Sequence, residues 1–117
     1  MNLRFLPAAR EELDAAASYL ENRVAGLGGE FLDDVERTGA LLCQFSQIGR
    51  RLDSIHREVP LQRFSFNLVY RNFRGEAVIV AVAHKRRRPG YWRGRTDPLT
   101  IGSSDRGVAS SVNQGGG

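Results

Sequence analysis

Residues 77–83 read Ala77-Val78-Ile79-Val80-Ala81-Val82-Ala83, and this stretch decides the fold. Every side chain in it is apolar and most are β-branched, a pattern typical of a central strand that is covered on both faces. The segment Arg63–Arg71 alternates instead, which predicts a strand with one buried face. That face would carry Phe64, Phe66, Leu68 and Tyr70. The sequence Asn72-Phe73-Arg74-Gly75-Glu76 between the two predicts a hairpin turn, with glycine where φ is positive.

The residues before this hairpin predict a short strand, two helices and a further strand. Met1–Leu6 alternates weakly, as a strand does. Apolar residues then recur at helical spacing from Ala8 to Val24 and again from Glu30 to Phe45. Glycines at 26 and 28 separate the two helical segments, so we expect an antiparallel helical hairpin. Residues 55–59 predict a strand that ends before a proline.

This order of elements predicts a single α+β domain. An N-terminal strand joins a mainly antiparallel β-sheet, and the antiparallel helical hairpin packs on one face of that sheet. The domain is expected to span residues 1–95. Residues 96–117 are rich in glycine and serine and lack periodicity, which predicts a disordered tail.

Charge is divided unevenly along the chain. Residues 8–40 hold eight acidic residues against three arginines, whereas residues 50–95 hold twelve basic residues against three acidic ones. Eleven of those twelve are arginine, whose planar guanidinium binds phosphate and carboxylate through paired hydrogen bonds. A surface of this charge predicts binding to nucleic acid, to a ribonucleoprotein or to an acidic protein.

The composition disfavours several classes of protein. No apolar run approaches the roughly 18 residues that span a membrane, and the apolar part of Met1–Leu6 is too short for a secretory signal. Cys43 is the only cysteine, so no internal disulfide and no cysteine metal cluster are expected. We therefore expect a cytoplasmic protein with no membrane association, no cofactor and no bound metal.

Four motifs follow one another along the chain. They are Ile48-Gly49-Arg50 after the second helix, Arg63–Arg71 as the central strand, Ile79–Arg87 as the last strand with a basic exit, and Pro89-Gly90-Tyr91-Trp92-Arg93. In this order they resemble the motifs of the RelE/ParE superfamily, the toxins of type II toxin–antitoxin systems, which include plasmid stabilisation systems. The resemblance covers residues 1–95 and favours the ParE-like branch. It implies a toxin that inhibits growth by acting on DNA gyrase, with no catalytic residue.

The same resemblance leaves open a RelE-like toxin, an endoribonuclease that cleaves messenger RNA on the ribosome. Such cleavage needs a base, an acid and cations around the phosphate. That branch carries an arginine two residues before the Val-Tyr step of the central strand, where this sequence has Asn67 or Leu68, and the only lysine here is Lys85. If the chain is a nuclease, the predicted catalytic residues are His84, Arg87 and Tyr91. A third hypothesis, outside this family, is a plain RNA-binding module.

The predicted target-binding residues follow the end of the last strand, and one arginine comes from the strand before it. They are Arg63, His84, Lys85, Arg86, Arg87, Arg88, Tyr91, Trp92 and Arg93. Plainer interpretations exist: His84 could be a structural hydrogen-bond partner, residues 85–88 a solvated run of charge, and the two aromatic residues packing at the sheet edge. The resemblance also implies a cognate antitoxin, a small acidic DNA-binding protein that forms a tight heteromer with the toxin.

Overall fold

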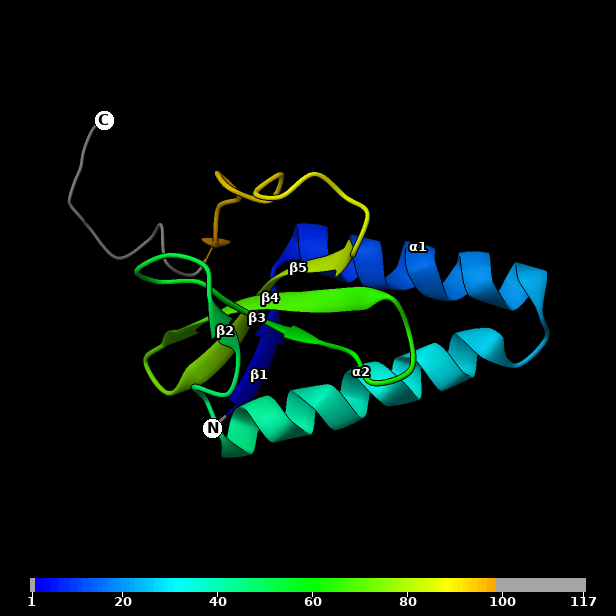
Figure 1. Cartoon of the computed structure of the whole chain (residues 1–117), viewed down its shortest axis with the longest axis horizontal. Coiled ribbons are helices and arrows are strands. Elements are labelled where there is room, and N and C mark those ends of the chain that lie inside the picture. Colours follow the sequence, from blue (N-terminus) through cyan, green and yellow to red (C-terminus); the bar gives the residue numbers. More distant parts are fainter. Residues whose placement is uncertain (1, 99–117) are drawn as a thin grey trace.

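The computed structural model describes residues 2–98, which form two helices and one five-stranded sheet (Figure 1). The elements are β1 (Asn2–Phe5), α1 (Pro7–Arg23), α2 (Leu27–Gln44), β2 (Arg50–Arg51), β3 (Arg57–Pro60), β4 (Phe66–Phe73) and β5 (Glu76–His84). The strand order is β1-β5-β4-β3-β2, and all neighbouring strands are antiparallel except β1 and β5. The expected α+β fold is confirmed, and one parallel pair makes its sheet mixed.

β5 is the most deeply buried strand. Residues 77–83 are all buried, as the continuous apolar run predicted. β4 and β5 form a hairpin in which Phe73 pairs with Glu76. The turn between them consists of Arg74 at φ 49° and Gly75 at φ 77°. Two successive positive values are what a two-residue type I′ turn requires, and glycine adopts them without strain.

Both helices pack on one face of the sheet, with α1 along β5 and α2 along β1 (Figure 1). α1 begins after Leu6, which offers no side-chain cap, and Pro7 occupies its first position, where no backbone N–H is needed. Phe31 of α2 is fully buried. Its ring meets the rings of Phe64 and Phe66 edge-on at centroid distances of 5.4 and 5.0 Å. These contacts fix the helical hairpin of α1 and α2 on the sheet.

The third strand starts later than the sequence predicted. Ile55, expected as its first residue, is 57% exposed, and β3 begins at Arg57. The carboxylate of Asp53 accepts the backbone N–H groups of Ile55 and His56 at 2.9 and 2.7 Å. This side-chain turn competes with strand pairing and delays it.

After β5 the chain turns back over the sheet as a segment without helix or strand, which we call the strap (residues 85–97). Val82 of β5 lines a groove with α1, whereas Ala83 lines a pocket with the strap. Since successive side chains of a strand point to opposite faces, the strap covers the face of the sheet opposite the two helices. Trp92 is 4% exposed and is the contribution of the strap to the core.

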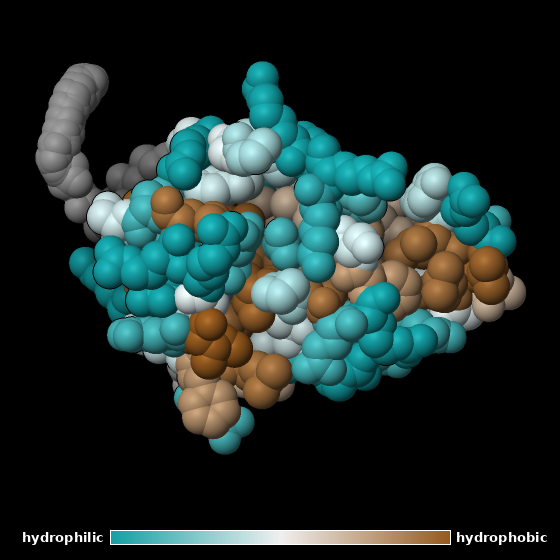
Figure 2. Space-filling model, in the orientation of Figure 1, coloured by the Kyte–Doolittle hydropathy of each residue, from teal (hydrophilic) through white to brown (hydrophobic). Residues whose placement is uncertain are grey.

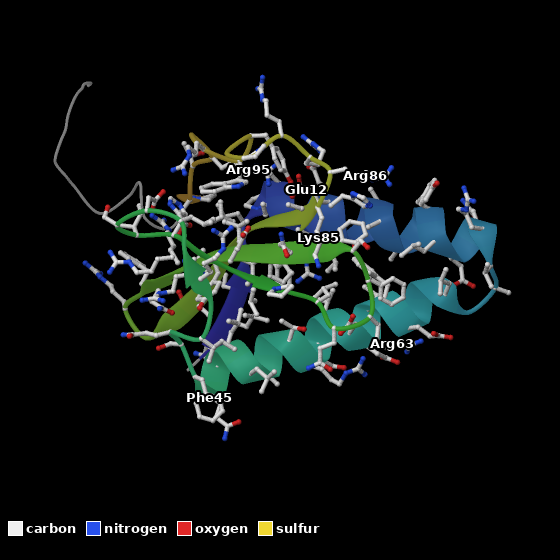
Figure 3. All side chains as sticks on the ribbon, viewed as in Figure 1. Glu12, Phe45, Arg63, Lys85, Arg86 and Arg95 are labelled. Carbon is white, nitrogen blue, oxygen red and sulfur yellow. The ribbon has the colours of Figure 1, made fainter. Side chains whose placement is uncertain are left out.

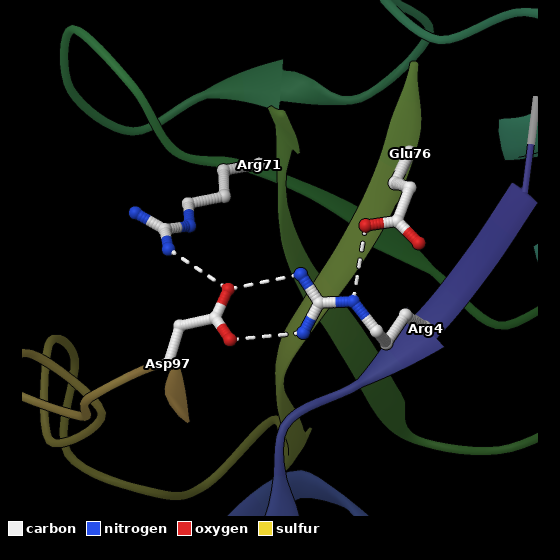
Figure 4. A network of polar contacts seen from close by, with 4 residues as sticks. All are labelled: Arg4, Arg71, Glu76 and Asp97. Carbon is white, nitrogen blue, oxygen red and sulfur yellow. Dashed lines mark hydrogen bonds and ion pairs between the residues drawn. The ribbon is translucent and has the colours of Figure 1, made fainter. Parts of the chain in front are cut away.

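The strap ends in a buried network of ion pairs (Figure 4). The side chain of Asp97 is 1% exposed, and its oxygens accept hydrogen bonds from both terminal nitrogens of Arg4 at 2.9 and 3.0 Å. Arg71 donates to the same carboxylate at 3.4 Å, and Glu76 accepts from Nε of Arg4 at 3.1 Å. The described fold thus extends past the expected boundary at residue 95 to Asp97. Residues 99–117 of the expected tail lie outside the described residues.

Apart from Asp34 and Asp97, the charged side chains of residues 2–98 lie wholly or partly at the surface. Figure 2, which has the orientation of Figure 1, shows mostly hydrophilic residues where the strap runs. Exposed apolar side chains lie near the turn of the hairpin and at the end of α2, such as Val24 and Phe45. Within residues 2–98, no helix has the length and apolar character needed to cross a membrane. The strap begins with the longest run of cations and is the best candidate for a binding surface.

Candidate target-binding site

The strap and the sheet enclose a pocket of about 300 Å³. Seven of the nine predicted target-binding residues line it: His84, Lys85, Arg87, Arg88, Tyr91, Trp92 and Arg93. The sheet side adds Arg50, Asn67 and Glu58, the last of which pairs with Arg50. The pocket therefore has a cationic rim and an aromatic wall. In the described part of the chain, no group of three His, Cys, Asp or Glu residues is placed to hold a metal ion.

The cations of the strap fall into two groups. Arg93 pairs with Asp53, and Arg95 pairs with Glu12 at 2.7 Å, so their charges are neutralised within the fold. For the run 85–88, no carboxylate among residues 2–98 lies within ion-pairing distance. All four side chains are exposed, and they lie at the start of the strap. These four cations, which we call the basic run, are available to an anionic partner.

The two aromatic residues of the strap differ in exposure and in contacts. Trp92 is buried, and its ring centroid lies 4.6 Å from that of His56. This position makes Trp92 a packing residue, one of the two interpretations that the sequence left open. Tyr91 is half-buried at the pocket wall, and the guanidinium of Arg87 lies 3.8 Å from its ring centroid. This distance is within the range of a cation–π interaction, which holds Arg87 at the rim.

Tyr91 is held in turn by Glu12 of α1, which Figure 3 shows beside Arg95. The Tyr91 hydroxyl donates to Oε2 of Glu12 at 2.7 Å. Burial, together with this bond, raises the pKa of Tyr91 to about 12. Burial also acts to raise the pKa of Glu12, but hydrogen bonds from Arg95, Tyr91 and the Val82 N–H outweigh it and leave that pKa below its ordinary value. At neutral pH the carboxylate is therefore charged and the phenol neutral.

His84 stands at the end of β5, where the strap begins. Its Nδ1 accepts the backbone N–H of Arg86 at 3.0 Å, and its ring meets Phe66 edge-on at 5.0 Å. With Nδ1 engaged as an acceptor, the proton of the neutral imidazole resides on Nε2. Neither ring nitrogen then has a lone pair available to accept a proton from a substrate. This arrangement makes His84 a hydrogen-bond partner that shapes the first turn of the strap.

Arg63 lies apart from the other predicted site residues. Its guanidinium pairs with Glu30 of α2 at 2.7 Å, and Figure 3 shows it beside that helix. The backbone N–H groups of Gln62 and Arg63 donate to the buried carboxylate of Asp34 at 3.3 and 2.8 Å. These contacts tie the loop before β4 to α2. The structure therefore gives Arg63 a role in holding the hairpin, away from the pocket.

Sequence reasoning missed the acidic residues that fix the strap. Glu12 lies 79 positions from Tyr91 along the chain, and Asp53 lies 40 positions from Arg93. No local motif marks either acid. The one available signal was the surplus of acids in the first half and of arginines in the second, which indicates attraction between the halves without identifying the pairs.

The chain matches the model of a known protein family over most of its length. The family is described as the ParE toxin of the type II toxin-antitoxin system, parDE, and the match spans residues 3–89. The chain belongs to the ParE toxin family. A solved structure described as the chromosomal ParDE TA system from P. aeruginosa is similar in fold to this ParE-family toxin, with a TM-score of 0.58 and 21% sequence identity over 72% of this chain and 95% of that chain. No curated protein matches the chain.

The ParE match includes Glu12 and the whole of the basic run but ends at residue 89. Tyr91, Arg95 and Asp97 lie beyond it. The anchors of the strap in this ParE toxin are therefore established by its own structure and not by the family match.

Proposed function

We propose that this ParE-family toxin inhibits growth by binding DNA gyrase, and that the basic run makes the contact. One observation carries the proposal: these four cations have no acidic partner in the described fold, whereas Arg93 and Arg95 beside them are paired. Adjacent like charges repel one another, so an unneutralised run raises the free energy of the free protein. A target surface of opposite charge relieves that repulsion and also speeds association.

The geometry supports binding rather than catalysis. His84, Arg87 and Tyr91 do line one pocket, as a variant ribonuclease would require. However, the Tyr91 proton is donated to Glu12, and a pKa of about 12 makes this phenol a poor proton donor at neutral pH. The lone pair of His84 is occupied by the N–H of Arg86. Neither of the two residues is poised for acid–base chemistry in this arrangement.

Membership of the family also supports two further parts of the proposal. The chain acts in the cytoplasm, where its target is found, and it is held inactive by a cognate antitoxin. That antitoxin is acidic, because the pocket rim and the basic run present cations that carboxylates neutralise. Binding of the antitoxin over the same cations would prevent contact with gyrase.

The test uses purified toxin in two assays, gyrase supercoiling and translation of a defined message on ribosomes. We expect inhibition of supercoiling without cleavage of the message. Cleavage of the message without a supercoiling defect would overturn the proposal in favour of the ribonuclease.

A triple variant tests the contact itself. Replacing Arg86, Arg87 and Arg88 by alanine removes three charge-assisted contacts of about 1.5–3 kcal/mol each, so inhibition should weaken by roughly a thousandfold or more. The matched control replaces three exposed arginines elsewhere, Arg23→Ala, Arg51→Ala and Arg74→Ala, and removes the same charge. Equal loss in both variants would show that only net charge matters. Full inhibition by the first variant would show that the basic run is merely solvated.

A further inference from the structure

The edge of β5 beside β1 is only partly paired by a strand. β1 pairs with β5 as far as Ile79. Beyond that point two side chains take the place of the missing strand: Glu12 accepts the N–H of Val82 at 3.0 Å, and Arg95 donates to the carbonyl of Val80 at 2.9 Å. Backbone groups of a buried strand need hydrogen-bond partners. Glu12 and Arg95 therefore complete the edge of the central strand.

Glu12 also ties the strap to α1. Arg95 donates to both oxygens of the Glu12 carboxylate, at 2.9 and 2.7 Å, and the Tyr91 hydroxyl donates to one of them at 2.7 Å. Together with the Val82 N–H, four hydrogen bonds converge on this carboxylate. The side chains of Glu12 and Arg95 are 18% and 19% exposed. A bidentate pair shielded in this way fixes the geometry of both partners.

A chain of contacts leads from Glu12 to the basic run. Glu12 holds the hydroxyl of Tyr91, and the ring of Tyr91 carries the guanidinium of Arg87 at 3.8 Å. The backbone of Arg87 is fixed in turn, since its N–H donates to the carbonyl of His84 at 2.9 Å. Arg87 therefore has a defined position at the pocket rim, although its charge has no acidic partner within the described residues.

We propose that Glu12 is a positioning residue for target binding. It does not touch the target; through Tyr91 and Arg95 it holds the strap in the conformation that presents the basic run. This inference rests on the proposed function, in which the basic run makes the contact. Without Glu12 the strap occupies several conformations, and the apparent affinity for the target falls in proportion to the fraction that is competent.

The variant Glu12→Gln tests this role with little change in size. Glutamine offers one acceptor oxygen and places an NH₂ donor against the donors of Tyr91 and Arg95, so the convergent arrangement cannot form. Glu11→Gln is the matched control, because it removes the same charge from the neighbouring, exposed position of α1. Trp92 is the only tryptophan, so its fluorescence reports the state of the strap alone.

Three readouts are expected to change together in Glu12→Gln and to stay constant in Glu11→Gln. The emission of Trp92 should shift to the red as the indole meets water. The pKa of Tyr91 should fall from about 12 toward the ordinary value near 10, because burial raises it most and is lost as the strap opens, and because the hydrogen bond and the charge of Glu12 also raise it. The toxin concentration that half-inhibits the target should rise roughly tenfold, as it does when about a tenth of the molecules are competent.

Other outcomes overturn the inference. Unchanged Trp92 emission would show that Glu12 does not hold the strap, whether or not inhibition is lost. A red shift with undiminished inhibition would show that the position of the strap does not matter for the target. If Glu12→Gln does not fold by circular dichroism, Arg95→Gln removes the same ion pair from the strap side. Its Trp92 emission and inhibition decide in the same way.

The triple alanine variant separates this inference from the proposed function. If that variant keeps full inhibition, the basic run is not the contact and that part of the proposed function fails, whatever Glu12→Gln does. If the triple variant loses inhibition while Glu12→Gln keeps it, the proposed function stands and the positioning role of Glu12 is refuted. Glu12 and Arg95 belong to the same ion pair. A variant that combines Glu12→Gln and Arg95→Gln should therefore inhibit the target no less than the single variant with the larger loss.

Discussion

The network at Asp97 leads to a quantitative prediction about where the folded domain ends. Asp97→Asn keeps the shape of the side chain but removes its charge and replaces one acceptor oxygen by a donor. The two hydrogen bonds from Arg4, at 2.9 and 3.0 Å, and the one from Arg71 at 3.4 Å cannot all survive this change. Arg4 keeps one carboxylate partner, because Glu76 accepts from its Nε at 3.1 Å.

The magnitude follows from burial. Removing one partner of a buried ion pair costs about 3–5 kcal/mol when the other charge is left uncompensated. The side chains of Arg4 and Arg71 are 19% and 23% exposed, and Glu76 still faces Arg4, so the loss is smaller than this. We expect the free energy of unfolding to fall by about 2–3 kcal/mol. For a domain of this size that corresponds to a decrease in Tm of roughly 10–20 °C.

Thermal denaturation followed by circular dichroism measures the effect. The control is Glu30→Gln, which breaks the ion pair between Glu30 and Arg63. Both side chains of that pair are about half exposed, so the substitution should lower the free energy of unfolding by less than about 1 kcal/mol. A chain truncated after residue 95 should lose at least as much stability as Asp97→Asn. A Tm of Asp97→Asn within the range of the Glu30→Gln control would show that the Asp97 network adds little stability. In that case the stable domain would end at residue 95, as the sequence alone predicted.

Three further predictions concern the interior and the strap. Tyr70 is fully buried, and its hydroxyl accepts the N–H of Gly49 and donates to the carbonyl of Ser46, each at 3.0 Å. Tyr70→Phe should therefore lower the free energy of unfolding, measured by urea titration, by about 1–3 kcal/mol. Tyr19→Phe on the surface should change it little. A Cβ at Gly49 would lie 2.7 Å from the Tyr70 ring, while one at Gly29 would meet no atom within 4 Å. In the same urea titration, Gly49→Ala should clearly lower the free energy of unfolding, whereas Gly29→Ala in α2 should leave it unchanged or raise it slightly. The folded pKa of Tyr91, about 12, exceeds its unfolded value near 10, so the stabilisation from its neutral phenol is complete below pH 10 and is lost as the pH rises toward 12. The difference in phenolate absorbance between the wild type and Tyr91→Phe isolates this phenol among the three tyrosines, and it should change together with Trp92 emission in that range; a difference that appears near pH 10 would contradict this.

Much of the sheet could be predicted because burial imposes a period on the sequence. The run at 77–83 is apolar throughout since β5 is covered on both faces, and the alternation in β4 places Leu68 and Tyr70 in the core. Val69 shows where the pattern fails. Alternation placed it on the opposite face from Tyr70, yet it is 1% exposed, because the strap covers that face and a register shift lies between the two residues. A covering segment without periodicity of its own gives no signal in sequence.

The candidate site could be predicted only as a segment. The sequence placed the residues from His84 to Arg93 together, and the structure brings most of them to one pocket. It could not distinguish a cation that is paired from one that is not, because that depends on acids from distant elements such as Glu12 and Asp53. The same limit explains Arg63, whose partner Glu30 lies on α2, 33 positions away.

The pairing of charges gives the uneven distribution along the chain a physical meaning. The acidic first half and the basic second half are not two separate surfaces, because Arg63 pairs with Glu30 and Arg95 with Glu12 across them. Each such pair neutralises a cation and fixes a segment to the hairpin at the same time. The cations of the strap therefore have two roles. Arg93 and Arg95 anchor the segment through ion pairs, and the basic run at its start keeps its charge. An anchored run loses less conformational entropy on binding than a free one. If the basic run makes the proposed contact, the internal ion pairs of the strap therefore raise its affinity without touching the target.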